Sequence, residues 1–467
     1  MLTVAYLANL FPSPVEPYVA EEIEELRSRG LRVISCSVRR SGHNNGPAAQ
    51  VVLQPVSVAL MLRAAWLCLR EWNQISPLLG RILLRGKEGP IRRLKAIVHT
   101  GLGACHAVKL KGRRVDHVHV HHGYFGSWIA MVAARLLHVK FSMTLHGSDL
   151  LLHGAYLDLK LAESDFCFTV SEYNRQYLLE RYFNLDPRKV IVARLGVDVA
   201  EISPPYSPKP RRIGAPVTLL SVGRLHTVKD HAFLVRACAH LKERRVPFEC
   251  QIAGDGLERR RLASLIRKLG LEEQVALLGH IQREQMDSLY DRADVVVLTS
   301  RSEGIPLVLM EAMSRGKVVL APAITGIPEL VSHRKAGFLY QAGSMEDFLR
   351  RLLFICSSLQ LERMPAHPAG SLRLEPASLP LSPDKRLDWV RHAARVQVGH
   401  NFNRKTNLQS FGDLFIPRIA ARSESLPHEN PVLQQIQLPI QRDRSIPVRI
   451  DGTDAGTGAR SSPVLHG

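Results

Sequence analysis

One stretch decides the fold: Asp294-Val-Val-Val-Leu-Thr-Ser-Arg-Ser-Glu-Gly-Ile-Pro-Leu-Val-Leu-Met-Glu311. Its first part, Asp294–Thr299, is rich in β-branched residues and predicts a buried strand of a parallel sheet. Pro306 then stands in the first turn of a predicted helix, where proline is tolerated, and that helix continues through Glu311. A strand, a polar loop and a helix in this order are typical of a doubly wound α/β sheet, in which ligands bind beyond the carboxyl ends of the strands.

The same rhythm of strands and helices extends on both sides of this stretch. Further strands are expected near residues 216–222, 248–253, 274–278, 317–321 and 337–340, with helices between them. The first 199 residues begin in the same way, with a strand at 2–8, a helix from Pro17 and a strand at Leu31–Val38. The chain therefore predicts an α/β protein with two Rossmann-like, doubly wound domains.

Composition sets the expected boundaries. Residues 200–215 are rich in proline and arginine and predict a linker between an N-terminal domain, 1–199, and a C-terminal domain, 216–356. Residues 357–385 are rich in Pro, Ser and Leu and predict an irregular insertion. Helices are expected again at 386–421, and the polar tail 422–467 is expected to be disordered.

Four loops with chemistry-bearing residues follow strands of the second predicted domain. They contain Gly223-Arg224 with Lys229, Gly254-Asp-Gly256, Glu303-Gly-Ile-Pro306, and Thr325-Gly-Ile-Pro-Glu329. Arg224 and Lys229 have the charge to bind a diphosphate, and the helix after Glu303 offers it free backbone N–H groups. Each loop alone is weak evidence, because surface arginines and turn glycines are common. Four such loops at successive strand ends are a strong indication of a ligand site.

Glu311 lies among apolar residues of the predicted helix. A buried carboxylate without a partner is costly, so its side chain either turns to solvent or pairs with a hydroxyl or cationic group. The first alternative is an ordinary helix glutamate, and the second is typical of a binding site.

Together these segments resemble the family 4 glycosyltransferases. That family has the GT-B fold and carries Gly-Arg-Leu…Lys, Gly-x-Gly and Glu-Gly-x-Pro…Glu-Ala in this order, as do Val222–Lys229, Ala253–Gly256 and Glu303–Ala312. The resemblance implies that the two domains face each other across a cleft. It also implies a retaining, metal-independent hexosyltransferase whose donor is a nucleotide-sugar, UDP- or GDP-linked.

The resemblance also assigns roles to residues. Those implied to be catalytic are His146, Glu303, Arg224 and Lys229. Those implied to bind the donor are Gly223, Arg224, Lys229, Gly254, Gly256, Glu303, Gly304, Ile305, Pro306, Leu307 and Glu311. In these roles Arg224 and Lys229 hold the diphosphate, Glu303 contacts the sugar and Glu311 binds the ribose hydroxyls. Asp230 stands where many relatives have glycine. No metal or other cofactor is expected, since the sequence lacks the Asp-x-Asp motif that GT-A transferases need.

The N-terminal half contains candidate acceptor residues. The loop Phe11-Pro-Ser-Pro-Val-Glu16 is similar to one in an exopolysaccharide-type subgroup that includes enzymes of colanic acid assembly. Glu16 is the acceptor-side candidate, or equally an acid favoured at a helix start by the dipole. His146, in Thr144-Leu-His-Gly-Ser-Asp149, is implied by the resemblance to face the donor sugar. The alternative is that Ser148 or Asp149 caps a helix and His146 is structural.

A run of histidines, His117-Val-His119-Val-His121-His122, allows another interpretation. Strand alternation predicts that His117, His119 and His121 share one face. The pattern is similar to the His-x-His-x-Asp-His metal motif of metallo-β-lactamase-like hydrolases, but His121 stands where that motif needs Asp. A metal-dependent hydrolase is therefore a remote alternative.

The chain is strongly basic, with 62 Lys and Arg against 43 Asp and Glu and a net charge of +19. This predicts a polyanionic partner. Residues 56–114 combine tryptophans and leucines with clustered Arg and Lys, as in helices that adsorb to an anionic membrane surface, although solvated helices are an equal alternative. No nucleic-acid partner is expected, because no known nucleic-acid motif is present and aromatic residues make up only 6%, so a nucleic-acid-binding protein is a remote alternative.

The expected acceptor is a saccharide or lipid-linked saccharide in exopolysaccharide or cell-surface polysaccharide biosynthesis. A GT-B-fold phosphorylase or a nucleotide-sugar epimerase is the nearest alternative. The N-terminus resembles a strand rather than a signal peptide, and no apolar run is long enough to span a bilayer. The expected location is cytoplasmic, with peripheral attachment to the cytoplasmic face of the inner membrane.

Overall fold

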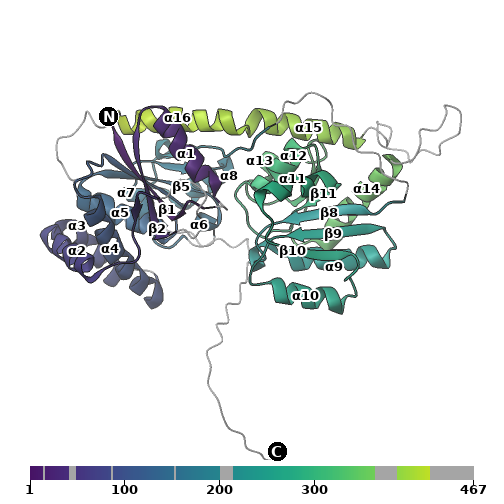
Figure 1. The fold of residues 1–467 in the computed structure, drawn as a ribbon, viewed down its shortest axis with the longest axis horizontal. Coiled ribbons are helices and arrows are strands. Elements are labelled where there is room, and N and C mark those ends of the chain that lie inside the picture. Colours follow the sequence, from purple (N-terminus) through teal and green to yellow (C-terminus); the bar gives the residue numbers. More distant parts are fainter. Residues whose placement is uncertain are drawn as a thin grey trace, which may run out of the picture.

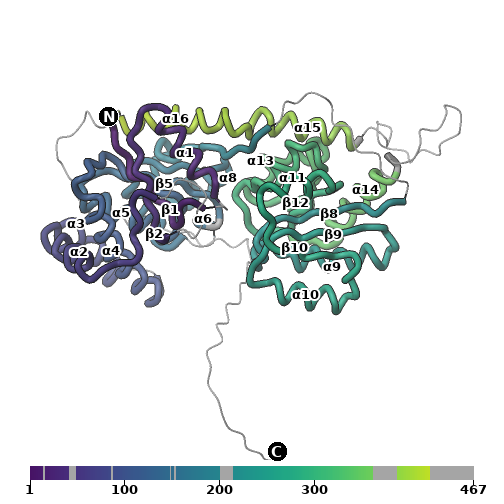
Figure 2. Tube along the Cα trace, viewed as in Figure 1, coloured from purple at the N-terminus to yellow at the C-terminus, as the bar shows by residue number. Residues whose placement is uncertain are grey.

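The computed structural model describes residues 1–13, 16–40, 49–85, 88–151, 154–199, 214–362 and 386–420. The chain forms two α/β domains, each built around one parallel sheet (Figure 1). In Figure 2 the purple and blue N-terminal half lies on the left and the teal and green C-terminal half on the right. The predicted fold class is confirmed. The predicted tail, and most of the predicted linker and insertion, lie outside the described residues.

The N-terminal domain consists of a seven-stranded sheet covered by helices on both faces. Its elements are β1 (Thr3–Phe11), α1 (Pro17–Ser28), β2 (Arg32–Arg40), β3 (Val51–Val52), α2 (Val58–Arg70), α3 (Trp72–Leu83), α4 (Pro90–Leu110), β4 (His117–His121), α5 (Phe125–Leu137), β5 (Lys140–Leu145), α6 (Ser148–Leu151), α7 (Leu157–Glu163), β6 (Cys167–Thr169), α8 (Glu172–Arg181), a 3-10 turn η1 (Pro187–Lys189) and β7 (Val190–Val192). The strand order is β3-β2-β1-β4-β5-β6-β7, so the winding direction reverses between β1 and β4.

The C-terminal domain repeats this plan with six strands. Its elements are β8 (Val217–Val222), a 3-10 turn η2 (Thr227–Lys229), α9 (His231–Glu243), β9 (Phe248–Ala253), α10 (Arg259–Lys268), β10 (Val275–Gly279), α11 (Arg283–Arg292), β11 (Val295–Val297), α12 (Leu307–Ser314), β12 (Val318–Pro322), α13 (Ile327–Leu330), β13 (Phe338–Tyr340) and α14 (Met345–Glu362). The order β10-β9-β8-β11-β12-β13 reverses between β8 and β11. Such a reversal is where open α/β sheets bind their ligands.

Continuous apolar runs explain why these strands form. β8 and β11 are buried along nearly their whole length, as expected for parallel strands covered on both faces. In the N-terminal sheet, β1 pairs with β4 so that Val4 is beside His117 and Tyr6 beside His119. Alternation places the three strand histidines on one face, as predicted, and that face is covered by α1 and the C-terminal helix.

Two C-terminal helices connect the domains (Figure 1). α15 (Arg386–Asn401) packs on the C-terminal domain, and α16 (Arg404–Ala420) crosses to the N-terminal one. Between α15 and α16, the chain contacts the segment Gly196-Val-Asp198. There the Val197 N–H donates to the Phe402 carbonyl at 2.9 Å. Within the N-terminal domain, Phe411 and Phe415 of α16 pack against Phe166 and Phe168.

The predicted start of the irregular insertion at residue 357 is wrong. α14 continues to Glu362, because Leu352, Ile355, Cys356 and Leu359 form one buried helical stripe. The serines beside this stripe do not interrupt it; the Ser358 hydroxyl donates back to the Phe354 carbonyl. The C-terminal domain therefore extends beyond residue 356.

The basic stretch 56–114 forms three helices, α2, α3 and α4, at the outer end of the N-terminal domain (Figure 1). Across the described ranges of the chain, no helix combines the length and apolar character needed to cross a bilayer.

Candidate active site

The predicted donor residues gather where the C-terminal sheet reverses its winding direction. Gly223, Arg224 and Lys229 follow β8, and the segment Glu303–Leu307 follows the neighbouring β11. Pro306 is the N-cap residue of α12, and no side chain caps that helix start. Free N–H groups of a first helical turn attract anions, so this edge has the electrostatics of a phosphate site.

Lys229 and Glu303 form an ion pair across this edge. The Lys229 ammonium donates to Glu303 Oε1 at 2.5 Å, and the Lys229 carbonyl accepts from the Thr299 hydroxyl at 3.0 Å. Arg224, in contrast, is exposed. It lies close enough to Glu16 of the other domain to influence that carboxylate electrostatically.

Glu311 has the hydroxyl partner that its apolar surroundings require. The Tyr290 hydroxyl donates to Glu311 Oε2 at 2.6 Å, and the Arg315 guanidinium lies over the Tyr290 ring. Burial nevertheless raises the pKa of Glu311 above its ordinary value. The helix thus holds a carboxylate that retains one oxygen for a further donor.

Gly254 and Gly256 are required for contact between two loops. A Cβ at Gly254 would lie 2.0 Å from the Gly223 carbonyl oxygen, and one at Gly256 would lie 2.5 Å from the Leu225 carbonyl oxygen. Both also have positive φ angles, 137° and 155°. These glycines allow the loop after β9 to pack on the loop after β8.

Asp230 also has a positive φ, 44°, which explains why glycine suits this position in similar sequences. Its carboxylate accepts from Arg301 Nε at 2.9 Å. The charged side chain thus joins the loop after β8 to the loop after β11.

The two domains meet at His146 and Gly304. A Cβ at Gly304 would lie 2.0 Å from the His146 carbonyl oxygen, and a Cβ at Gly147 would lie 2.8 Å from the Gly304 nitrogen. A second contact comes from the fourth predicted loop, where the Glu329 carboxylate accepts the N–H groups of Glu172 and Tyr173 at the start of α8. Ile305 is buried behind Gly304 and packs with the core of its own domain.

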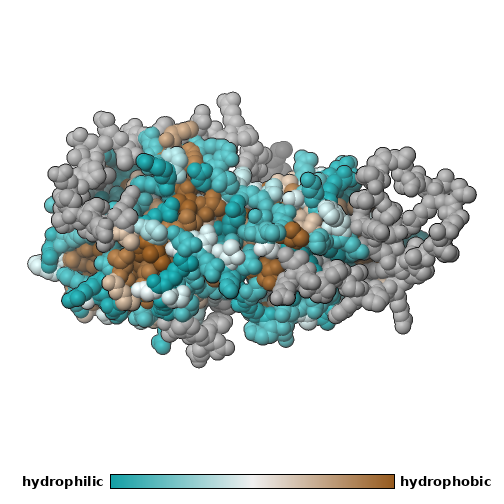
Figure 3. Space-filling view, turned by 90° about the horizontal axis from the view of Figure 1, so that it is seen from above, coloured by the Kyte–Doolittle hydropathy of each residue, from teal (hydrophilic) through white to brown (hydrophobic). Residues whose placement is uncertain are grey.

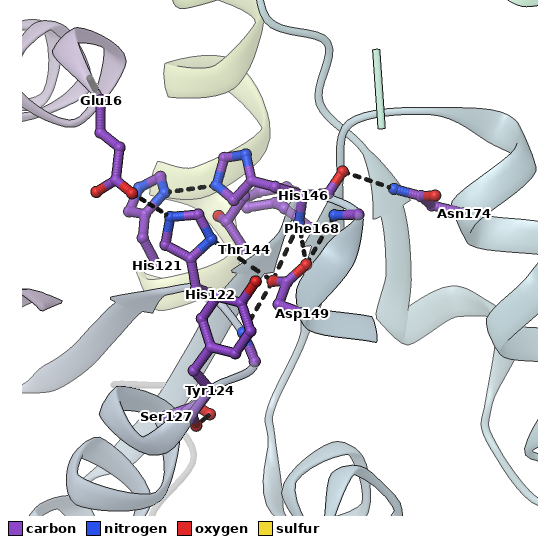
Figure 4. A network of polar contacts seen from close by, with 12 residues as sticks. Glu16, His121, His122, Tyr124, Ser127, Thr144, His146, Asp149, Phe168 and Asn174 are labelled. Atoms are coloured by element: carbon purple, nitrogen blue, oxygen red, sulfur yellow. Dashed lines mark hydrogen bonds and ion pairs between the residues drawn. The ribbon is translucent and has the colours of Figure 1, made fainter. Parts of the chain in front are cut away.

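His122 links the acceptor-side candidate to the His146 loop (Figure 4). Its Nε2 lies 3.0 Å from Glu16 Oε1, and its Nδ1 lies 3.7 Å from Asp149 Oδ2. Although burial opposes it, hydrogen bonding to Asp149 and Glu16 raises the pKa of His122 to about 9. His122 is therefore an imidazolium at neutral pH. Its φ of 69° is uncommon for a residue with a side chain, and such backbone strain often accompanies function.

His146, in contrast to His122, is neutral at this pH. Burial, together with the neighbouring His122 and His121, holds the pKa of His146 well below its ordinary value. Its Nε2 lies 2.9 Å from His121 Nδ1, and its backbone N–H donates to the Asp149 carboxylate at 3.1 Å. Asp149 also accepts the Gly147 N–H at 2.7 Å, so it shapes the loop that presents His146.

A metal centre is not needed to explain the histidine run. Donor atoms of Glu22, His119 and His121 all lie within 4.8 Å of one another, close enough to bind a cation. Yet both ring nitrogens of His119 already have hydroxyl partners, Ser142 at 2.8 Å and Thr144 at 3.1 Å. Buried polar groups that are fully hydrogen-bonded are stable without a metal.

Sequence reasoning missed several members of this network: Glu22, His121, His122, Asp149 and Tyr290. The histidine run was the available signal, but it indicated a metal motif rather than hydrogen bonds between histidines. Tyr290 and Glu22 had no such signal, because each reaches its partner across the fold from a different element.

Two family models match the chain. Residues 15–201 match "Glycosyltransferase Family 4", and residues 205–366 match "Glycosyl transferases group 1". Together the two matches extend over most of the chain, and they divide it where the two sheets divide.

The chain belongs to the family 4 glycosyltransferases.

Among relatives, this family 4 chain is similar to WcaL of Escherichia coli K12, a colanic acid biosynthesis glycosyltransferase by name. The identity is 37% over 171 residues, which is 35% of this chain and 41% of WcaL. It is also similar to AmsK of Erwinia amylovora, an amylovoran biosynthesis glycosyltransferase, at 28% identity over 59% of this chain and 69% of AmsK. The match to WcaL thus spans less than half of that protein's length.

A solved structure confirms the GT-B fold. HepE of Anabaena in complex with UDP-glucose aligns with a TM-score of 0.61 over 91% of this chain and 100% of HepE, at 16% identity. At this identity the likeness concerns the fold alone.

Because the pKa of His122 is raised in the folded protein, folding stability should depend on pH. An unfolded histidine has a pKa of about 6.5, so the stabilisation is fully present below that pH and is lost as pH rises through about 9. This shift in the pKa of His122 corresponds to at most about 3 kcal/mol in the free energy of unfolding. We expect His122→Gln to lower Tm most near pH 6 and little near pH 10.

Thermal unfolding of both proteins between pH 6 and 10 measures this difference. His138→Gln, which alters an exposed histidine, is the control. A gap in Tm between parent and His122→Gln that stays constant over this range would contradict a charged His122.

Proposed function

We propose that this chain is a retaining hexosyltransferase that moves a sugar from a UDP- or GDP-linked donor to a saccharide or lipid-linked saccharide acceptor. One observation carries the proposal: at the reversal of the C-terminal sheet, the loop after β11 meets the His146 loop, and its Glu303 pairs with Lys229 of the segment after β8. The names of WcaL and AmsK support a role in exopolysaccharide or other cell-surface polysaccharide biosynthesis. HepE, which shares the fold, binds UDP-glucose and supports the donor class.

The proposed chemistry depends on stabilising the leaving diphosphate. As the bond from the anomeric carbon to the phosphate oxygen breaks, negative charge develops on that oxygen. Arg224, Lys229 and the start of α12 would stabilise this charge. The acceptor oxygen attacks the same face of the sugar, and its proton passes to the departing phosphate, so the configuration is retained without a protein base.

The other predicted site residues have supporting roles in this proposal. Glu303 keeps Lys229 in place through their ion pair and would contact the donor sugar. Glu311, held by Tyr290, would accept hydrogen bonds from the ribose hydroxyls. Glu16 would lie on the acceptor side, because it belongs to the N-terminal domain and faces Arg224. No metal or other cofactor takes part in this scheme.

An anionic membrane surface is the proposed partner of α2 and α4, which pack together. Val58, Leu62, Trp66 and Leu69 form one stripe along α2, and each is more than half exposed. Ile91, Leu94 and Val98 form a similar stripe on α4. Figure 3, seen from above with the N-terminal domain on the left, shows separate hydrophobic patches on both halves of the surface, the larger ones on the N-terminal half. Exposed apolar stripes on two neighbouring helices are typical of an interaction surface.

Charge favours an acidic lipid surface as the occupant. Residues 56–114 contain twelve Lys and Arg and only two acidic residues, Glu71 and Glu88. Both acids are already paired, Glu71 with His138 and Glu88 with Arg81. Apolar side chains flanked by an excess of cations suit insertion among acidic headgroups. The proposed location is therefore the cytoplasm, at the cytoplasmic face of the inner membrane, where a lipid-linked acceptor would be found.

The proposed contact between Glu311 and the ribose hydroxyls leads to a prediction for nucleotide binding. We expect Glu311→Ala to weaken UDP or GDP binding roughly 10- to 100-fold, because a hydrogen bond to a charged group contributes about 1.5–3 kcal/mol. Isothermal calorimetry measures this, with the exposed Glu243→Ala as control. Equal affinity in a folded Glu311→Ala protein would remove Glu311 from the site.

The reaction itself can be tested with panels of UDP- and GDP-sugars and lipid-linked saccharides. We expect transfer with retained anomeric configuration, and we expect it to survive EDTA because no metal is involved. Product analysis by NMR and mass spectrometry separates the alternatives. An epimerised nucleotide-sugar would indicate an epimerase, and phosphate-dependent release of sugar would indicate a phosphorylase. Activity lost in EDTA and restored by divalent metal would contradict the metal-free scheme.

Vesicle sedimentation tests the membrane partner. We expect the protein to pellet with anionic vesicles at low salt, and much less with neutral vesicles or at high salt, since each basic residue contributes about 1 kcal/mol near an acidic surface. Replacing Arg63, Arg92 and Lys95 by Gln should reduce pelleting, as should Trp66→Ser. The matched control replaces Arg260, Arg267 and Lys268 of α10, exposed cations of the other domain. An equal loss of pelleting in both triple variants would contradict a membrane-binding surface specific to α2 and α4.

A further inference from the structure

A chain of hydrogen bonds leads from the core of the N-terminal domain to His146. Its members come from four parts of the fold: Tyr6 of β1, Glu22 of α1, His121 of β4, and His146 in the loop after β5. The Tyr6 hydroxyl donates to Glu22 Oε2, and His121 Nε2 lies 2.9 Å from the same oxygen and 2.9 Å from the Tyr6 hydroxyl. His121 Nδ1 then lies 2.9 Å from His146 Nε2. Glu22 and His121 are both fully or almost fully buried.

The direction of these bonds follows from the chemistry of the groups. A carboxylate only accepts hydrogen bonds, so both neighbours of Glu22 Oε2 must donate to it. The single proton of the Tyr6 hydroxyl is used in its bond to Glu22, and the proton between Glu22 and His121 then resides on His121 Nε2. With its ring proton on Nε2, His121 has a lone pair on Nδ1, which can only accept. The proton between the two rings must therefore belong to His146 Nε2. Neutral His146 consequently carries its lone pair on Nδ1.

We propose that Glu22 and His121 are positioning residues that fix the tautomer of His146 and so make its Nδ1 a hydrogen-bond acceptor. Within the described residues, no group is a hydrogen-bond partner of this nitrogen. The available lone pair suits a hydroxyl of a bound sugar. This last step rests on the proposed glycosyl transfer, whereas the position of the proton does not.

The surroundings of His146 keep this acceptor from being protonated. The groups that face it are His121 and His122 of β4 and the turn after it, Asp149 of α6, and the Tyr18 ring of α1 at 4.9 Å. His122 is a cation bound to Glu16 and Asp149, and its ring centre lies 4.5 Å from that of His146. A second positive charge at this distance is disfavoured in a buried site. One histidine is thus charged and its neighbour neutral.

Long-range nitrogen NMR of the full-length protein labelled with ¹⁵N-histidine reads the tautomer directly. His146→Gln identifies the His146 signals by difference. In the parent we expect Nε2 to have the shift of a protonated ring nitrogen and Nδ1 that of an unprotonated one. In Glu22→Gln, whose amide can donate as well as accept, and in Glu22→Leu, we expect part or all of the proton on His146 to move to Nδ1.

Kinetics give the second measurement. In both Glu22 variants we expect kcat/KM for transfer to fall roughly 10- to 100-fold, since a substrate hydroxyl then meets a donor instead of an acceptor. The Kd for the nucleotide should not change, which separates this effect from misfolding. His119→Asn is the matched control, because His119 is equally buried on the same strand but bonds to Ser142 and Thr144.

Three results would overturn the proposal. The first is a parent in which His146 carries its proton on Nδ1, or Glu22 variants in which the tautomer does not change. The second is an altered tautomer with unchanged kcat/KM. The third is one equivalent of tightly bound metal in the purified protein, because a metal held by Glu22 and His121 would occupy the nitrogens that relay the proton. If the parent transfers no sugar to any acceptor, the proposed function fails, while the NMR result still decides the tautomer.

Discussion

The contact between Gly304 and the His146 carbonyl determines how the two domains present their loops to each other. Neither Gly304 nor Gly147 has room for a Cβ, so two backbones touch where most loops would be separated by side chains. This contact brings the start of α12, with its free N–H groups, against the loop that carries His146. Because both loops leave the carboxyl ends of parallel strands, the strand order of each sheet fixes where they meet.

The electrostatics of the site depend on this proximity. Glu16 and Asp149 hold His122 as a cation, and burial, together with the charge of His122, keeps His146 neutral. In the other domain, Glu303 is paired with Lys229 while Arg224 is exposed. The charges of the N-terminal side are thus mutually satisfied. An incoming diphosphate would meet one exposed guanidinium and a helix start, and both interact favourably with negative charge.

The sequence predicts the sheets well and the network poorly, for a physical reason. Strands such as β8 and β11 are marked by local runs of apolar residues, and the Glu303 loop has its proline and glycine within a few positions. Glu311 was expected to need a partner, but Tyr290 could not be named because it comes from another helix. Likewise, the periodicity of α1 shows an amphipathic helix and gives no sign that Glu22 reaches His121 of β4. Local patterns encode elements, whereas side-chain partners depend on packing between elements.

The last helix, α16, packs beside the buried residues that lead to the site. Phe415 packs edge-on against His117 and His119, on the same face of the sheet where Tyr6 and Glu22 contact His121. The Tyr6 end of the chain of hydrogen bonds therefore lies in one core cluster with α16, which follows α15 of the opposite domain. Arg404 strengthens the crossing by pairing with Glu21, the residue before Glu22 on α1. Since a buried carboxylate needs dry, fixed surroundings to control a proton, the helix that joins the domains also protects the group that sets the state of His146.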